Sequence, residues 1–330
     1  MSKYNQNVAL IGCGYWGSIL AKNLKKIIKK KIYIYDIDKK NLKNLSNQLE
    51  GLIPINNISD IYKNDNIKNI FLATPPSKNF KILKNLIHYK KNIFVEKPFL
   101  NNLNHLKKIK GLLIKNKNIF MVGYVYIYNE IIQKIKKIIK SKKLGEILYI
   151  KTQRENLGPI RNDMDCNYDL ASHDIAIITY LLNGNLKIIS KKSHYFLKKN
   201  ISDISLLELK YKNTKIDIQS SWLNPEKVRK LVIIGTKKML LFDELNNRET
   251  LKIFDQYAEY PKITQMGKKI LSEKARIYRG KYISVPNEFK SPVINEIKHF
   301  FECVKNKKTP ITNFKFSENI LKILSKINRN

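Results

Sequence analysis

Short apolar runs alternate with lysine-rich amphipathic stretches along the first 126 residues of this chain. The stretches space their apolar residues at helical intervals, as Ile19, Leu20, Leu24 and Ile27 do within residues 18–30. The apolar runs have the length of strands and read "NVALIG", "KIYIYDID", "NIFLATPP", "NIFVEKP" and "IFMVGYVY". Parallel strands need such crossovers, so the alternation predicts a doubly wound parallel sheet with helices on both faces. We expect it to form a separate domain over residues 1–122.

The pattern changes beyond residue 122. After one helical segment at 130–140, strand-like runs follow one another with short turns between them, and a helix over about residues 170–182 interrupts them. Successive strands of this kind predict a large, open, mostly antiparallel sheet. We therefore predict a second α/β domain over residues 123–292, with residues 256–292 polar and irregular. Two helices, over about residues 293–305 and 317–327, close the chain.

The composition excludes several classes of protein. The chain has 330 residues, no apolar run approaches the roughly 18 residues of a membrane span, and no signal-peptide core precedes the first strand. We therefore expect a cytoplasmic protein with no membrane partner. The formal net charge is +36, but the basic residues are nearly all lysines spread along the chain. This pattern predicts attraction of an anionic substrate rather than a nucleic-acid partner.

The three cysteines are odd in number and widely spaced, so they predict neither a disulfide framework nor a metal site.

The stretch "GCGYWG" follows the first strand and opens the first helix, which is the context of a dinucleotide-binding turn. Gly12 permits the tight turn, Gly14 lets the backbone approach a pyrophosphate, and Gly17 lets helix and strand pack closely. Asp36 ends the next strand, where a carboxylate accepts hydrogen bonds from the adenosine ribose and repels a 2′-phosphate. The pattern predicts a Rossmann domain that binds NAD in preference to NADP. Asp38 is the alternative residue for the same role.

Two further motifs end neighbouring parallel strands, and ligands of open parallel sheets bind beyond those carboxyl ends. "ATPP" places Thr74 beside the nicotinamide half of the cofactor, and "EKP" places Lys97 beside the reacting atoms, where an ammonium group stabilises negative charge on oxygen. Pro76 taken alone is equally well explained as a strand terminator. We therefore expect the cofactor to contact Gly12, Gly14, Tyr15, Trp16, Gly17, Asp36, Ala73, Thr74, Pro75, Glu96 and Lys97.

The combination of "GCGYWG", Asp36, "ATPP" and "EKP" resembles the Gfo/Idh/MocA oxidoreductase family over nearly the whole chain. The resemblance implies that the last helices, residues 293–330, pack back on the Rossmann domain. A further motif, "YDLASHDIAIITYLL", places Asp169 and His173 four residues apart, so both project from one helix face. The family's motif has an Asp and a His at that spacing. It implies a catalytic set in which His173 is the general base and Asp169 contacts the substrate or orients His173. In that set Lys97 binds the reacting oxygen, and whether it also takes part in the proton transfer stays open.

Within the family, the chain resembles dehydrogenases of nucleotide sugars, which serve the synthesis of surface polysaccharides and often oxidise the third ring carbon. This resemblance implies a sugar or nucleotide-sugar substrate. The loop before the catalytic helix carries polar side chains that could bind a diphosphate or sugar hydroxyls, although solvated loop residues explain each of them equally well. Tyr124, Tyr126 and Tyr128 alternate along one expected strand, and Tyr126 could stack on a sugar or pack in the core. The expected substrate-binding residues are Lys97, Tyr126, Arg154, Asn156, Arg161, Asn162, Asp169 and His173.

Two alternative functions stay open from the sequence. The same residues would serve a ketosugar reductase that runs in the reverse direction, and the fold could also be a non-catalytic dinucleotide-binding sensor. A large sheet with one face free of helices needs a cover, so we also expect a homodimer or homotetramer in which the second domain mediates oligomerisation.

Overall fold

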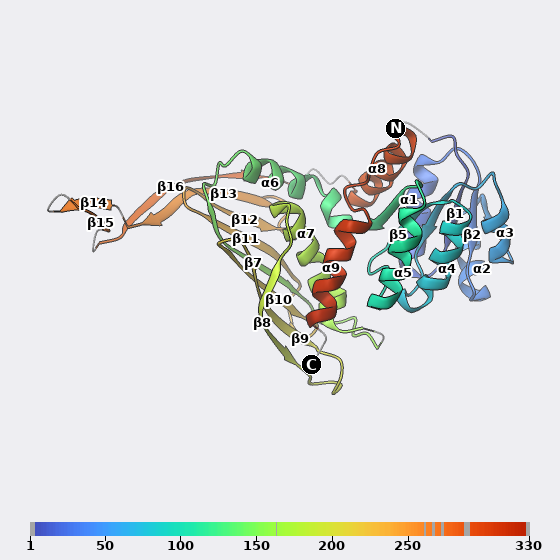
Figure 1. Cartoon of the computed structure of the whole chain (residues 1–330), viewed down its shortest axis with the longest axis horizontal. Coiled ribbons are helices and arrows are strands. Elements are labelled where there is room, and N and C mark those ends of the chain that lie inside the picture. The colour runs from blue at the N-terminus through green and yellow to red at the C-terminus, as the bar shows by residue number, and fades with distance from the viewer. Residues whose placement is uncertain are drawn as a thin grey trace. The chain divides into compact units, whose positions relative to one another are not determined.

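The computed structural model describes residues 4–162, 164–260, 262–265, 268–271, 274–286 and 291–327 of the chain (Figure 1). It divides into two compact units, of which the first comprises Met1–Asn129 and Lys290–Asn330 and the second comprises Glu130–Phe289. The boundary between them therefore falls after Asn129, and the end of the chain belongs to the first unit.

The first unit contains a six-stranded sheet in the order β3-β2-β1-β4-β5-β6, and all neighbouring strands are parallel. This is the strand order of a doubly wound dinucleotide-binding sheet. The fold class predicted from the alternating pattern is confirmed. The strands are β1 (Val8–Ile11), β2 (Ile32–Tyr35), β3 (Leu52–Pro54), β4 (Asn69–Leu72), β5 (Asn92–Glu96) and β6 (Phe120–Gly123).

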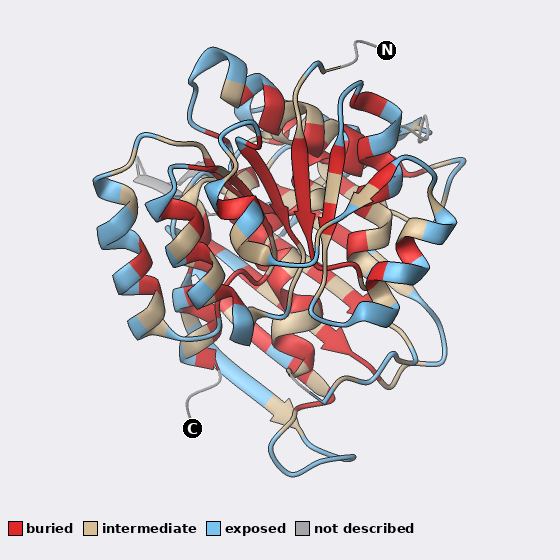
Figure 2. Ribbon diagram, turned by 90° about the vertical axis from the view of Figure 1, so that its right-hand side faces the viewer, coloured by how far each residue is buried: buried red, intermediate tan, exposed pale blue. Residues whose placement is uncertain are grey.

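Helices cover this sheet, which explains why its central strands are continuous apolar runs. Every residue of β1 and β4 is buried, as parallel strands covered on both faces are. Figure 2 shows these buried strands among helices that turn their exposed residues outward. The covering helices that follow the strands are α1 (Tyr15–Ile27), α2 (Lys39–Gln48), α3 (Ile58–Lys63), α4 (Pro76–His88) and α5 (Leu103–Ile114).

The last two helices, α8 (Pro292–Asn306) and α9 (Phe314–Ile327), pack within the first unit. α8 contacts α1, and α9 contacts α5 and β6. Phe300 of α8 is fully buried, and its ring centroid lies 5.2 Å from that of Phe71 on β4 and 6.0 Å from that of Phe94 on β5. Aromatic burial therefore fixes this distant part of the sequence to the parallel sheet.

The second unit is built on an eight-stranded sheet in the order β16-β13-β12-β11-β7-β10-β9-β8. Only the β7–β10 pair is parallel among these neighbours, as predicted for a mostly antiparallel sheet. Helix α6 (Glu130–Lys140) packs on α7 (Ser172–Leu182), which a π-helical turn at Asn167–Ala171 precedes. The strands are β7 (Ile147–Glu155), β8 (Lys187–His194), β9 (Ile204–Tyr211), β10 (Thr214–Ser221), β11 (Val228–Gly235), β12 (Met239–Asp243), β13 (Leu251–Glu259) and β16 (Arg276–Val285).

Two expectations about local structure are wrong. The strand expected to carry three alternating tyrosines ends at Gly123, where its pairing with β5 stops at Glu96, and the chain continues as a 3-10 helix, η1 (Val125–Tyr128). Residues 256–292 were expected to be irregular, but β13 and β16 pair across part of them, and β14 (Lys262–Gln265) pairs with β15 (Lys268–Leu271). Nine of the ten residues of β16 are exposed, so no buried face imposes an alternating pattern on its sequence.

Within the described residues, no helix is both long and apolar enough to cross a membrane.

Replacing Phe300 with Ala should lower the free energy of unfolding of the first unit by about 3–5 kcal/mol, because it empties a fully buried aromatic site. Denaturant unfolding monitored by circular dichroism checks this value. The matched change Phe196→Ala removes a ring that is 67% exposed, so we expect it to cost less than about 1 kcal/mol. Equal losses in the two variants would contradict the packing of α8 described above.

Candidate functional site

The glycine-bearing turn between β1 and α1 is shaped by close backbone approaches. Gly12 has a φ of +99°, and a Cβ at this position would lie 2.5 Å from the carbonyl oxygen of Ala73. A Cβ at Gly17 would lie 2.0 Å from the carbonyl oxygen of Gly12. Gly14, the N-cap of α1, has open space where its Cβ would be. The turn therefore leaves room at the N-terminus of α1, whose free N–H groups and dipole suit the pyrophosphate of a dinucleotide.

Asp36 lies at the end of β2 and contacts this turn directly. Its Oδ2 accepts a hydrogen bond from the backbone N–H of Cys13 at 2.6 Å, and its Oδ1 accepts one from Asp38 N at 2.8 Å. An ionised carboxylate has about four acceptor positions, so Asp36 can also accept hydrogen bonds from ribose hydroxyls. The carboxylate of Asp38 accepts from Lys40 N as the N-cap of α2. The structure thus gives Asp38 a helix-capping role.

A buried asparagine, which the sequence reasoning missed, links the "ATPP" and "EKP" motifs. Asn79 on α4 is 0% exposed; its Oδ1 accepts a hydrogen bond from the hydroxyl of Thr74, and its Nδ2 donates to Phe99 O at 3.1 Å. Thr74 is therefore held at the end of β4, and the chain after Lys97 is held beside it. The available signal was an Asn three residues inside a helix that starts at Pro76, but nothing in the sequence names its partners.

Glu96 extends from the end of β5 across to β6. Its carboxyl oxygens lie 2.9 and 3.0 Å from where a Cβ of Gly123 would be, so the glycine makes room for them. Burial raises the pKa of Glu96 to about 7, although the indole N–H of Trp16 and the charge of Lys97 oppose this shift. The Trp16 Nε1 approaches this carboxyl group without a hydrogen bond of ordinary geometry. Trp16, Glu96 and Lys97 thus meet within the first unit.

The remaining predicted cofactor residues differ in exposure. Ala73 and Lys97 are half-buried, Pro75 is exposed as the N-cap of α4, and the Tyr15 side chain is 84% exposed. The Cys13 thiol is buried, which raises its pKa to about 12, so it stays neutral near the turn. The arrangement of the turn, Asp36 and the strand ends fits a dinucleotide.

In the second unit, Asp169 lies in the π-helical turn and His173 lies in the first turn of α7. The indole Nε1 of Trp222 donates a hydrogen bond to the Oδ2 of Asp169 at 3.1 Å. Trp222 directly follows β10, is 0% exposed, and packs with Cys166 and Leu170. It therefore fixes the orientation of the Asp169 carboxylate. The sequence reasoning missed this residue because its partner lies 53 positions away.

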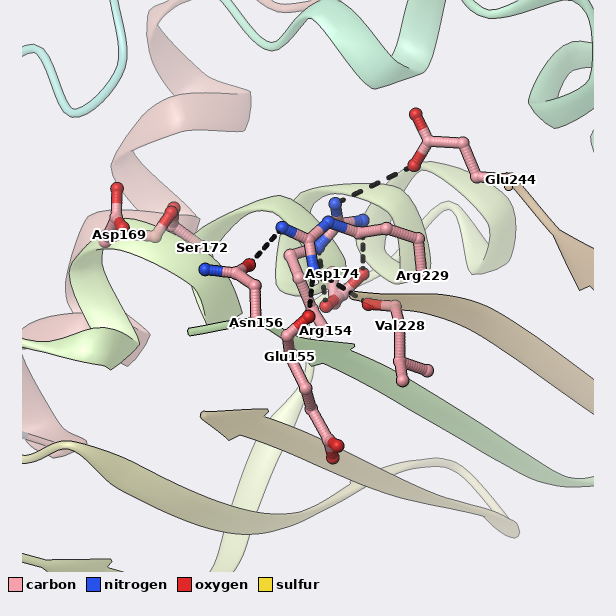
Figure 3. Close-up of polar contacts among 9 residues, drawn as sticks. All are labelled: Arg154, Glu155, Asn156, Asp169, Ser172, Asp174, Val228, Arg229 and Glu244. Atoms are coloured by element: carbon pink, nitrogen blue, oxygen red, sulfur yellow. Dashed lines mark hydrogen bonds and ion pairs between the residues drawn. The ribbon is translucent and has the colours of Figure 1, made fainter. Parts of the chain in front are cut away.

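Arg154 is buried on β7 and pairs with a carboxylate of the protein itself (Figure 3). Its Nε and NH2 atoms donate to the two carboxylate oxygens of Asp174 on α7 at 3.0 and 2.9 Å. Its NH1 lies 4.0 Å from the carboxylate of Glu244. Burial raises the pKa of Glu244 above its ordinary value. Bidentate pairs of this kind fix both partners in orientation, so the geometry makes Arg154 an anchor of α7.

The loop after β7 carries the other predicted substrate residues. Figure 3 shows Asn156 beside Arg229, whose NH2 donates to the Asn156 Oδ1 while its NH1 donates to Glu155 O at 2.8 Å. Asn162 is exposed and accepts from Lys198 Nζ at 2.6 Å, and Arg161 is half-buried. Tyr126 belongs to η1 of the first unit and is half-buried.

Among the described residues, no group of three or more His, Cys, Asp or Glu side chains could hold a metal ion.

Two family models match the chain. One, described as "Oxidoreductase family, NAD-binding Rossmann fold", matches residues 6–124, and the other, the GFO/IDH/MocA C-terminal domain, matches residues 132–241. Together these matches cover most of the two units.

Curated relatives and solved structures agree with these models. The chain is 23% identical to a scyllo-inositol 2-dehydrogenase (NAD(+)) of Bacillus subtilis, over 92% of the chain and 87% of the relative. It is also 23% identical to the uncharacterized oxidoreductase YrbE of the same organism, but the match spans only 59% of either protein.

Two solved structures share the fold. A UDP-N-acetylglucosamine 3-dehydrogenase from Acidithiobacillus ferrooxidans superposes with a TM-score of 0.79 at 14% identity, over 98% of this chain and 97% of that one. A mutant of a 3-ketoreductase from Actinomadura kijaniata, in complex with TDP-benzene and NADP, superposes with a TM-score of 0.77 at 10% identity. The match covers 98% of this chain and 97% of that one.

Replacing Trp222 with Phe should keep the apolar packing but remove the donor to Asp169. We expect kcat of the oxidoreductase reaction to fall about 10-fold, because Asp169 loses its fixed orientation, and the free energy of unfolding to fall by about 1–2 kcal/mol. The same change in an Asp169→Asn background is the control. If Trp222→Phe lowers kcat equally in both backgrounds, the tryptophan does not act through Asp169.

Proposed function

Because this chain belongs to the Gfo/Idh/MocA family of oxidoreductases, we propose that it is an NAD-dependent dehydrogenase that oxidises a ring hydroxyl of a sugar or nucleotide sugar. The chain has an NAD-binding Rossmann domain and the second domain of the same family. One observation supports the proposal most directly. The glycine turn lies at the same edge of the parallel sheet as four side chains, those of Asp36, Thr74, Glu96 and Lys97. The chain also contains the Asp169–His173 motif.

The residues of the first unit have distinct roles toward the cofactor. When bound, the nicotinamide ring supplies the acceptor for a hydride from the substrate carbon. The N-terminus of α1 binds the pyrophosphate across Gly14, and Asp36 binds the adenosine ribose. Thr74 and Glu96 lie at the ends of adjacent strands and bind the nicotinamide half.

Three side chains manage the proton of the substrate hydroxyl. His173 acts as the general base, since the ordinary pKa of histidine lies near neutrality. Lys97 binds the reacting oxygen and stabilises its negative charge. Asp169 orients His173 or contacts the substrate, and Trp222 holds Asp169 in place. Transfer of the proton by Lys97 itself is the alternative division of these roles.

The substrate that we propose is a nucleotide sugar oxidised at its third ring carbon, in a route to surface polysaccharides. The similarity in fold to a UDP-N-acetylglucosamine 3-dehydrogenase supports this choice. We assign substrate contacts to Tyr126, Asn156, Arg161 and Asn162, beside the catalytic residues. Arg154 acts through Asp174 on the position of α7, because its guanidinium group is 4% exposed and bidentate with that carboxylate.

The reverse reaction, reduction of a ketosugar, is a second candidate, and the similarity to a 3-ketoreductase favours it. The same residues serve both directions, so the preferred substrate distinguishes them. A non-catalytic dinucleotide sensor on this fold would bind the cofactor without turnover. We further propose that the chain acts as a homodimer or homotetramer in the cytoplasm.

Replacing Lys97 with Ala should lower kcat/KM by about 10²–10⁴-fold, because the reacting oxygen loses its charge partner. Absorbance of NADH measures turnover with a panel of UDP-linked acetamido sugars and inositols. Lys107→Ala, an exposed position on α5, is the matched control and should keep full activity. If the wild type oxidises a sugar and Lys97→Ala does so equally well, the assigned mechanism is wrong; a wild type that binds NAD but oxidises nothing supports the sensor.

Replacing Asp36 with Ser should shift the cofactor preference from NAD toward NADP. We expect the Kd for NAD to rise about 10-fold or more, because a charge-assisted hydrogen bond to the ribose is lost, and the Kd for NADP to fall as repulsion of the 2′-phosphate disappears. Titration calorimetry measures both constants. The control is Asp38→Asn, which keeps the cap of α2 and should leave the ratio of the constants unchanged. An unchanged ratio in Asp36→Ser would remove this residue from the cofactor site.

A further inference from the structure

Two carboxyl groups of the first unit have buried oxygens with no hydrogen-bond partner among the residues that the structure describes. Glu296 on α8 is 0% exposed, and neither of its carboxyl oxygens is hydrogen-bonded. The Oε1 of Glu96, at the end of β5, is also buried and also lacks a hydrogen-bond partner. Buried polar atoms in folded proteins nearly always have a partner. The indole of Trp16 approaches Glu96 and the backbone N–H of Tyr124 approaches Glu296, but neither makes a hydrogen bond of ordinary geometry to these three oxygens, which keep unused acceptor positions.

The two carboxyl groups approach the same short piece of chain from two elements. The Glu96 carboxyl lies against Gly123, within 3.0 Å of where its Cβ would be. The Glu296 carboxyl lies near the backbone N–H of the next residue, Tyr124, and the charge of Glu96 acts on it directly. α8 packs on η1, which begins at Val125, so the helix brings Glu296 to this point. Both carboxyl groups therefore lie beside the Gly123–Tyr124 peptide, although 200 positions of sequence separate them.

Two ionised carboxylates this close in a buried place repel each other strongly, so one of them holds a proton. A carboxylic acid donates a hydrogen bond, which an ionised carboxylate cannot do. We propose that Glu96 and Glu296 share one proton as a hydrogen-bonded acid pair, and that Glu296 is thereby a positioning residue for the turn that carries Lys97. The pairing is independent of the proposed function, and only its consequence for Lys97 rests on it.

Charged and polar groups from each neighbouring element face this acid pair. The Trp16 indole of α1 and Lys97 face Glu96, whereas Tyr124 and Tyr128 face Glu296. With one shared proton the pair carries a single negative charge, which the ammonium of Lys97 balances. The pair thus holds the backbone of Lys97 at the carboxyl end of β5.

Sharing a proton also makes the stability of the fold depend on pH. Burial raises the pKa of both groups above their unfolded values, to about 7 for Glu96 and well above the ordinary range for Glu296. The folded state therefore binds more protons than the unfolded chain above about pH 4.5. The stabilisation is complete below that pH, and it is lost as the pH rises through 7.

Infrared spectroscopy of the full chain tests the pair without reference to catalysis. At pH 7 the wild type should show the carbonyl stretch of a buried protonated carboxyl group, and Glu296→Gln should lose it. Glu302→Gln is the matched control, since it removes the same charge from an exposed position of α8 and should keep the band. The thermal midpoint should also fall by about 3 °C more between pH 5 and pH 8 in the wild type than in Glu296→Gln.

A wild type without a protonated carboxyl group at pH 7 overturns the inference, as does a Glu296→Gln variant that keeps both the band and the wild-type pH slope. If Glu296→Gln fails to fold, Glu96→Gln tests the pair from its other member and should lower the pH at which the band disappears, because the charge of Glu96 no longer acts on Glu296. A wild type that shows the band but oxidises no sugar removes the proposed function and leaves the acid pair standing.

Discussion

The turn between β1 and α1 has no room for a side chain at Gly12 or Gly17, and the candidate cofactor site depends on that close approach. The carbonyl oxygen of Ala73 lies 2.5 Å from where a Cβ of Gly12 would be, so the ends of β1 and β4 are in contact. Thr74, the next residue, donates a hydrogen bond from its hydroxyl to Asn79. Asn79 in turn donates to the carbonyl oxygen of Phe99, which holds the chain just after Lys97. One backbone contact thus sets the spacing of three motifs that lie far apart in the sequence.

Carboxylates in each of the two units are held by specific partners, although the chain carries an excess of lysine. Asp36 accepts from two backbone N–H groups, Asp169 accepts from the indole of Trp222, and Asp174 is bound in a bidentate pair by Arg154. Neutral or rigid donors orient a carboxylate, whereas a flexible lysine mainly supplies charge. The many exposed lysines add a general attraction for anions such as a nucleotide sugar.

The first unit was largely predictable because its signals are local. Buried parallel strands have continuous apolar sequences, and the glycine and proline turns mark their ends, so β1, β4 and β5 lie where the pattern predicts them. The motif from Tyr168 to Leu182 was also predictable as a helix, although its first turn is π-helical. The tyrosines after Gly123 misled the analysis, because alternation continues in the sequence after the strand loses its neighbour. Strand β16 was missed because nearly all of it is exposed, so no buried face imposes an alternating pattern on its sequence.

By itself, the sequence determined the order of strands and helices, the family and the cofactor turn, because each of these depends on near neighbours along the chain. Only the tertiary structure decided which buried polar groups meet. It placed Trp222 on Asp169 and Glu296 close to Glu96, and it turned Arg154 toward Asp174 on α7. A buried polar atom takes its partner from whichever element the fold brings beside it, and no spacing in the sequence records that choice.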